Sequence, residues 1–238
     1  MRELSPAQRH RVRVLAERDA ASAEPGGPTS GSQYELQLYQ LAEDRRRLKN
    51  IQSIKSKIAL KAQLLPKYQI WVDGVLAAGK GGQDDVLTTI LVWSIDAGDY
   101  ERAVQIASYA VTHKMTLPDQ YNRDIPTVLL DEFSEAFLHG KLAEDPALAV
   151  RVLAQIEHLT KDSDVPDQAR AKLHKALGYA LLVQANDGDD KRDLAGLSLE
   201  YAQAAYGSLT RALELFQGVG VKKDIETLER RLKKATQG

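Results

Sequence analysis

The stretch LLPKYQIWVDGVLAAGKGGQDDVLTTILVWSIDAG, residues 64–98, contains both tryptophans of the chain and a glycine-rich turn followed by two aspartates. Apolar residues recur at helical spacing on both sides of the turn, at Trp71, Val72 and Val75 before it and at Val86, Ile90 and Trp93 after it. The pattern predicts two helices joined by a turn, and we expect the core to form around them.

The bulk composition is that of a globular protein. The chain has 238 residues, of which 43% are hydrophobic and 27% charged, enough for one large or two small domains. No stretch approaches the roughly 18 apolar residues that a membrane-spanning helix needs, and the N-terminus is too polar for a signal peptide. The absence of cysteine excludes disulfides and thiolate chemistry.

Charge is distributed unevenly along the chain. Residues 1–67 hold 13 Lys/Arg and 7 Asp/Glu, a net charge of +6, whereas residues 68–238 hold 19 and 26, a net charge of −7. Between Arg45 and Lys67 there are eight basic residues and no acidic one. A basic segment on an otherwise acidic protein favours a polyanion-binding arm.

Helical patterns cover the whole chain, so the predicted fold class is all-α. We expect a basic N-terminal helical arm at 1–63, with helices at 5–24 and 33–63 separated by a flexible linker, PGGPTSGS, at 25–32. Pro66 is expected to end the second helix. Packed antiparallel hairpins should then fill 64–238, with helices at about 68–78, 84–97, 100–114, 126–139, 146–160, 166–185, 195–217 and 221–235.

The tract GDYERAVQIASYAV, residues 98–111, gives this second region a tetratricopeptide-like texture. A full 34-residue period does not hold along the chain, however. The tract therefore favours helical hairpins packed in a repeat-like way over a true repeat array. Unrelated amphipathic helices remain the alternative.

Two features of the central stretch resemble ligand-binding motifs, one for phosphate and one for a metal ion. Gly74-x-x-x-x-Gly79-Lys80-Gly81 nearly matches a phosphate-binding loop, but glycine stands where the magnesium-binding hydroxyl belongs, and a helix stands where a strand is required. We therefore interpret it as a helix–turn–helix connection. Asp84 and Asp85 could bind Mg²⁺ with Asp73 or Asp99, whereas the simpler interpretation makes the pair the start of a helix.

The basic tract also has two interpretations, a nucleic-acid surface or the solvated face of a long helix. The lack of compensating acids favours nucleic acid. The predicted phosphate contacts are Arg9, Arg11, Arg13, Arg45, Arg46, Arg47, Lys49, Lys55, Lys57 and Lys61. No catalytic residue and no cofactor is assigned, and Mg²⁺ enters only with the aspartate alternative.

Several tracts together resemble the small, endonuclease-named terminase subunit of temperate tailed phages that package DNA with cohesive ends. They are SPAQRHR at 5–11, LLPKYQIWVDGVLAAGKGGQDDVLTTILVWSIDAGDYERAVQIASYAV at 64–111, VPDQARAKLHKALGYAL at 165–181 and GVKKDIETLERRLK at 220–233. The resemblance implies a homo-oligomeric ring in the cytoplasm of the bacterial host. Such a ring would bind the cohesive-end site of concatemeric double-stranded DNA and recruit a large subunit with ATPase and nuclease activities.

Three hypotheses follow. The first is a DNA-binding packaging adaptor without activity of its own, in which residues 64–238 form the oligomer and bind the large subunit. The second is a metal-dependent endonuclease that uses Asp84 and Asp85 with Asp73 or Asp99. The third is a protein–protein scaffold that does not bind DNA.

Overall fold

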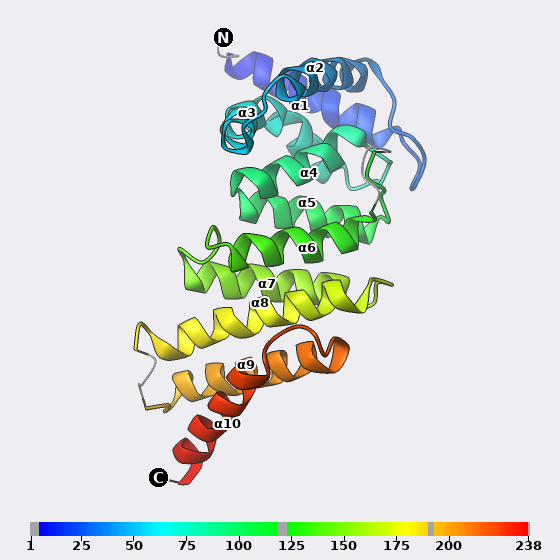
Figure 1. Cartoon of the computed structure of the whole chain (residues 1–238). Helices are drawn as coiled ribbons and strands as arrows, with labels where there is room; N and C mark the ends of the chain where they lie inside the picture. The colour runs from blue at the N-terminus through cyan, green and yellow to red at the C-terminus, as the bar shows by residue number, and fades with distance from the viewer. Residues whose placement is uncertain (1–4, 119–122, 190–192, 238) are drawn as a thin grey trace. The chain divides into compact units, whose positions relative to one another are not determined.

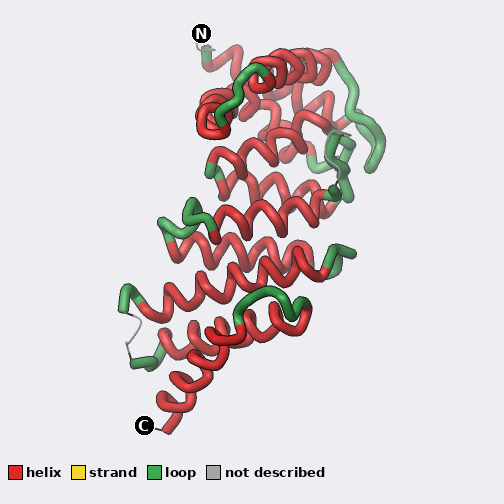
Figure 2. The backbone as a smooth tube through the Cα atoms, viewed as in Figure 1, coloured by secondary structure: helices red, strands yellow, loops and turns green. Residues whose placement is uncertain are grey.

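The computed structural model describes residues 5–118, 123–189 and 193–237. Within these ranges the chain is helical and contains no β-strand, only one isolated bridge between Pro28 and Gln83 (Figure 2). None of the described helices is long and apolar enough to cross a membrane. The prediction of an all-α fold is therefore confirmed.

The chain divides into two compact units, Met1–Ile125 and Pro126–Gly238. The helices of the first unit are α1 (Pro6–Ala21), α2 (Ser32–Lys49), α3 (Ile54–Ala78), α4 (Asp85–Ala97) and α5 (Tyr100–Thr112) (Figure 1). Those that follow are α6 (Ile125–Leu138), α7 (Pro146–Thr160), α8 (Asp167–Asn186), α9 (Leu197–Leu215) and α10 (Lys222–Gln237). The expected division at residue 63 falls in the middle of α3.

The helix expected over 33–63 is two helices, and the prediction that Pro66 ends it is wrong. A turn at residues 50–53 separates α2 from α3, because the Ser53 hydroxyl accepts a hydrogen bond from the backbone N–H of Ser56 at 3.3 Å and caps a new helix. α3 then continues through Pro66 to Ala78. The Ala62 carbonyl, which loses its helical partner at Pro66, lies on the exposed side of α3, where water can replace the missing donor.

Aromatic side chains from three helices form the centre of the first unit. Trp71 of α3 stacks on Tyr34 of α2 with ring centroids 5.5 Å apart, and Tyr68 of α3 meets Trp93 of α4 edge to face at 6.0 Å. Trp71 and Tyr68 are fully buried. Such aromatic pairs contribute about 0.5–1.5 kcal/mol each beyond the area that they bury. The core of the first unit therefore includes the central stretch, as the sequence pattern predicted.

The segment 25–32, expected to be a flexible linker, is packed against the glycine turn of the central stretch. Gly26 donates a backbone hydrogen bond to the Gly81 carbonyl at 3.0 Å, and Thr29 donates one to the Gln83 carbonyl at 2.9 Å. Gln83 in turn donates to the Gly27 carbonyl at 2.8 Å. These bonds fix the segment to the body of the first unit. α1 also packs on α3, so the structure does not confirm a separate N-terminal arm.

The second unit consists of helices that pack in sequence order. α7 packs on α8, α8 on α9, and α9 on α10. The α8–α9 contact is close because Gly178 of α8 leaves room for Leu209, whose side-chain atoms would be 2.7 Å from a β-carbon at position 178. Neighbouring helices in contact agree with the predicted helical packing, but a tetratricopeptide-like repeat is not confirmed.

Replacing Gly74 by alanine should destabilise the first unit. A β-carbon there would lie 2.7 Å from the β-carbon of Ala16, so α1 would have to move away from α3. We expect the free energy of unfolding to fall by about 1–3 kcal/mol, even though alanine favours a helix over glycine. Urea unfolding followed by tryptophan fluorescence measures this unit, because both tryptophans lie in it.

The substitution Ala16→Gly provides the control, because it removes the atom that the new β-carbon meets first. In the Gly74→Ala background it should restore part of the lost stability, although alone it destabilises α1. Strictly additive costs of the two substitutions would contradict the proposed contact.

Candidate nucleic-acid interface

Basic side chains gather around the turn between α2 and α3. Arg46, Arg47 and Lys49 lie in the last turn of α2, whereas Lys55 and Lys57 lie at the start of α3. A groove of about 570 Å³ opens between the two helices and is lined by Ala42, Arg45, Arg46, Leu48, Lys49, Lys57, Lys61 and Trp93. Five of its eight lining residues are cationic, which suits an anionic ligand.

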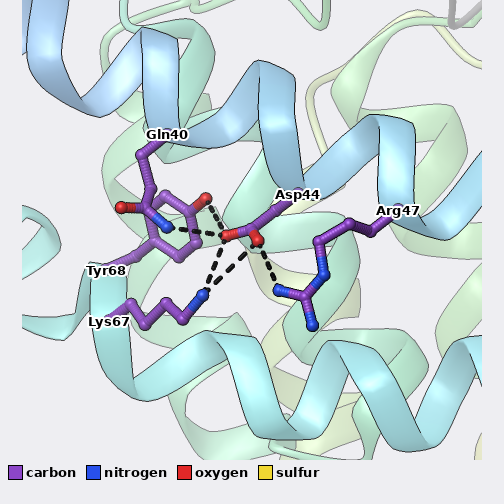
Figure 3. Close-up of polar contacts among 5 residues, drawn as sticks. All are labelled: Gln40, Asp44, Arg47, Lys67 and Tyr68. Atoms are coloured by element: carbon purple, nitrogen blue, oxygen red, sulfur yellow. Dashed lines mark hydrogen bonds and ion pairs between the residues drawn. The ribbon is translucent and has the colours of Figure 1, made fainter. Parts of the chain in front are cut away.

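The buried carboxylate of Asp44 holds α2 and α3 together beside this groove (Figure 3). It accepts hydrogen bonds from the Tyr68 hydroxyl at 2.9 Å, from Gln40 Nε2 at 3.1 Å and from Arg47 NH1 at 2.9 Å. Lys67 Nζ lies 3.4 Å from both of its oxygens.

Burial alone would raise the pKa of Asp44. The hydrogen bonds from Gln40 and Tyr68 and the charge of Lys67 outweigh burial and lower the pKa below its usual range. Asp44 is therefore ionised at neutral pH, and it fixes the orientation of α2 against α3.

Four of the ten predicted phosphate contacts are paired with acids of the same chain. Arg47 pairs with Asp44 as described, Arg46 with Glu43 at 2.6 Å, Arg13 with Glu17 at 3.5 Å, and Lys61 with Asp96. Within the described residues the other six have no acidic partner within 4.0 Å: Arg9, Arg11, Arg45, Lys49, Lys55 and Lys57. Arg45, Lys49, Lys55 and Lys57 gather at the α2–α3 turn and are the best candidates for phosphate contacts.

The basic residues of α1 form a second cluster. Arg9, His10 and Arg13 line a cavity of about 320 Å³ together with Ile70 and Asp73 of α3. Positions 57 and 70 of α3 are thirteen residues apart, about 20 Å along the helix axis at 1.5 Å per residue. The single basic arm expected from the sequence is thus two clusters, placed on opposite halves of α3.

Asp84 is a buried structural carboxylate. It caps α4 by accepting a hydrogen bond from the Leu87 N–H at 2.8 Å, and its other oxygen accepts one from Trp71 Nε1 at 2.9 Å. Its side chain is fully buried, so solvent does not reach it. Burial raises the pKa of Asp84 to about 6, although the hydrogen bonds from Leu87 and Trp71 act in the opposite direction.

The other three aspartates also have local partners. Asp85 accepts a hydrogen bond from Gln83 Nε2 at 3.2 Å, Asp73 forms an ion pair with Arg102, and Asp99 caps α5. Nowhere in the described parts of the chain do three His, Cys, Asp or Glu side chains come close enough to hold a metal ion together. The structure thus gives Asp84 and Asp99 roles as helix caps, whereas Asp73 pairs with Arg102 of α5 and Asp85 bonds to the neighbouring Gln83.

The glycines of the phosphate-loop-like sequence serve packing. Gly79 ends α3 with a φ of 64°, a left-handed conformation that favours glycine. A β-carbon at Gly81 would lie 2.2 Å from Nδ1 of His113, and one at Gly82 would lie 2.4 Å from the β-carbon of Ala23. The exposed Lys80 lies between Gly79 and Gly81. The turn is therefore the helix–turn–helix connection that we predicted.

Sequence reasoning missed two carboxylates that hold α2 in place. Asp44 lies one residue before the acid-free tract, yet nothing in its spacing showed that Tyr68 and Lys67 would meet it. Asp19 at the end of α1 accepts hydrogen bonds from the backbone N–H groups of Gln33 at 2.8 Å and Tyr34 at 3.2 Å. Asp19 thus caps α2 from another helix, and no local sequence pattern predicts this contact.

Comparisons with known proteins converge on one family. The model described as "Phage small terminase subunit" matches residues 38–168. "Terminase, endonuclease subunit" of Escherichia phage P2 is 40% identical over 229 residues, covering 96% of this chain and 86% of that protein. "Probable terminase, endonuclease subunit" of Haemophilus phage HP1 is 24% identical over 209 residues, covering 86% and 72%. No solved structure matches.

The buried Asp84 should make the stability of the first unit depend on pH. Its folded-state pKa of about 6 exceeds the ordinary 3.8, so the folded state binds more protons between these values, and stability falls as the pH rises from about 4 to about 6. At about 1.4 kcal/mol per pH unit, this contribution reaches at most about 3 kcal/mol.

The Asp84→Asn variant lacks this titration. Because other carboxyl groups titrate in both proteins, the quantity to measure is the difference in unfolding free energy between parent and variant, from urea unfolding at pH 4 to 6.5. The parent should lose stability relative to the variant as the pH rises. A difference that does not change with pH would contradict the role assigned to Asp84.

Proposed function

The chain belongs to the phage small terminase subunit family and takes part in phage DNA packaging, and we propose that within packaging it binds double-stranded DNA at the cohesive-end site through the α2–α3 turn. In this proposal it also recruits the large terminase subunit, which carries the ATPase and nuclease activities. The protein itself then needs no cofactor. Its place of action is the cytoplasm of the bacterial host.

The observation that carries this proposal is the cluster of Arg45, Lys49, Lys55 and Lys57 beside an open groove, with no acid paired to them among the described residues. A solvated helix face usually mixes charges of both signs and forms ion pairs along the helix. This cluster is instead available to phosphates. Binding would release counterions from DNA, which favours association at low salt.

The second unit is better suited to protein contacts than to DNA. Residues 126–238 hold 15 Lys/Arg and 18 Asp/Glu, a net charge of −3, so a DNA duplex would be repelled on average. Exposed apolar side chains of this unit include Val183, Leu197 and Phe216. We assign to it the contacts with the large subunit, and to the two units together the assembly of a homo-oligomeric ring.

The printed names of the relatives favour a second candidate, a metal-dependent endonuclease. It would use Mg²⁺ on Asp84 and Asp85 with Asp73 or Asp99. These aspartates already have partners within the protein, whereas a metal ligand must be free to approach the ion. This supports the first candidate, a DNA-binding protein without nuclease activity of its own. A third candidate, a scaffold that makes only protein contacts, predicts no binding of the full chain to DNA at low salt.

Replacing Arg45 and Lys49 together by alanine should weaken binding to DNA of any sequence. Two phosphate contacts are lost, so the slope of log affinity against log salt should become less steep by about 2. Fluorescence anisotropy with a labelled duplex between about 50 and 200 mM salt measures both quantities. Arg47 is left in place because it holds Asp44 and supports the fold.

The matched control removes the same charge from the second unit. Arg211 pairs with Glu214 at 2.9 Å and Lys233 with Glu229 at 2.7 Å, and both lie outside the proposed interface. The Arg211→Ala/Lys233→Ala variant should retain the parental slope. An equal loss in both variants would mean that net charge alone, and not this cluster, governs binding.

The nuclease candidate is tested separately, with the purified chain, cohesive-end DNA and Mg²⁺. We expect no nicking by the chain alone, since each candidate ligand is committed to a structural contact. Nicking that disappears in the Asp85→Asn variant, with unfolding free energy unchanged, would establish the nuclease candidate instead. Asp85 is the suitable position because, unlike Asp84, its side chain is only partly buried.

A further inference from the structure

The residues at the end of the α2–α3 hairpin differ in kind from the cations around them. The turn and the start of α3 read Asn50-Ile51-Gln52-Ser53-Ile54-Lys55, and all of these except Ile51 are exposed. Ile51 anchors the turn through its N–H, which donates to the Leu48 carbonyl at 3.2 Å. We call residues 50–54 the hairpin tip. It presents two amides, one hydroxyl and an isoleucine to solvent.

Ile54 is the most exposed large apolar side chain among the described residues, with 75% of its surface accessible. It lies beside Lys55 and one turn from Lys57, so cations surround it. A lone exposed isoleucine is common on protein surfaces and by itself indicates nothing. Here it stands at the point of a hairpin whose flanks are suited to phosphates, which would bring it close to the bases.

The start of α3 also breaks a local rule of helix stability. The N-terminus of a helix carries partial positive charge and favours acidic side chains in the first turn. α3 has no acid in its first turn, and Lys55 and Lys57 stand there instead. Glu35 of α2, Asp85 of α4 and Glu101 of α5 follow the rule, whereas α1, α6 and α7 lack an acid in the first turn as α3 does. A bound polyanion would neutralise the unfavourable charges at the start of α3.

We propose that the hairpin tip is the element that reads base sequence, with the start of α3 inserted into the major groove of duplex DNA. This inference rests on the proposed DNA-binding function. A helix with its side chains is about 10–12 Å across, which matches a major groove about 12 Å wide. Arg45 and Lys49 at the end of α2 then lie over the neighbouring phosphates.

The chemistry of the tip matches base edges of the major groove. The side-chain amides of Asn50 and Gln52 can each donate to and accept from adenine, whose edge presents N7 as acceptor and the N6 amino group as donor. Ile54 can contact the C5-methyl group of thymine, which projects into the same groove. The tip therefore favours A·T pairs at the positions that it reads, whereas the surrounding cations bind any sequence.

The test compares two duplexes of equal length and composition, one with the cohesive-end sequence and one shuffled. The tip variant Asn50→Ala/Gln52→Ala/Ile54→Ala should lose about 10-fold or more of the affinity ratio between them, because a lost base contact typically costs that much discrimination. Affinity for the shuffled duplex and its salt slope should change little, since no phosphate contact is removed. An unchanged ratio would overturn the inference and leave the proposed function intact.

The control variant Leu36→Ala/Tyr39→Ala removes two comparably exposed side chains of α2, 61% and 68% accessible, that lie away from the tip. It should keep the parental affinity ratio, and an equal loss in the control would overturn the assignment to the tip. If the parent binds neither duplex at low salt, the proposed function itself fails.

Uracil in place of thymine isolates the role of Ile54, because it deletes only the methyl group and keeps charge and pairing. The parent should bind the uracil-substituted cohesive-end duplex several-fold more weakly than the thymine duplex, whereas Ile54→Ala should bind both equally. Equal binding of the two duplexes by the parent would overturn the major-groove contact of Ile54.

Discussion

The α2–α3 hairpin, which carries the candidate interface, depends on one buried ion, the carboxylate of Asp44. Eight cations follow it between Arg45 and Lys67 without an acid among them, and their mutual repulsion opposes any compact arrangement of α2 and α3. Asp44 offsets part of this repulsion by binding Arg47 and Lys67. Its carboxylate also accepts hydrogen bonds from Gln40 and Tyr68. Because one buried acid fixes the two helices, Arg45, Lys49, Lys55 and Lys57 are held in place without an acidic partner among the described residues.

A second buried carboxylate organises the body of the unit. Asp84 joins the start of α4 to Trp71 of α3, and Trp71 stacks on Tyr34 of α2. The Tyr34 hydroxyl accepts a hydrogen bond from the Asp85 N–H at 3.2 Å and closes the connection. Losing the Asp84 carboxylate would leave a buried indole N–H without a partner, a cost of about 1–3 kcal/mol. The residues that most resemble an active site are therefore those that the packing of α2, α3 and α4 requires.

Glycine and aspartate are ambiguous in sequence because catalysis and compact folding use the same properties. A phosphate loop needs glycine for close approach of the backbone to an anion, whereas Gly74, Gly81 and Gly82 need it for close approach to Ala16, His113 and Ala23. A metal site needs several carboxylates whose oxygens converge on one ion, whereas a helix cap needs only one carboxylate. The missing hydroxyl at Gly81 and the helical pattern before Gly79 were sufficient to favour the structural role.

The sequence by itself determined the helices, the core at Trp71 and Trp93, the basic tract and the family, since all of these depend on local periodicity, composition and similarity. Only the tertiary structure decided that 33–63 is broken at Ser53, that α3 runs through Pro66, and that 25–32 is held against Gln83. It also decided which cations of the basic tract have an acidic partner and which have none among the described residues. Ion pairs and caps such as Asp44 with Lys67 or Asp19 with Tyr34 join residues distant in the chain, and their geometry exists only after packing.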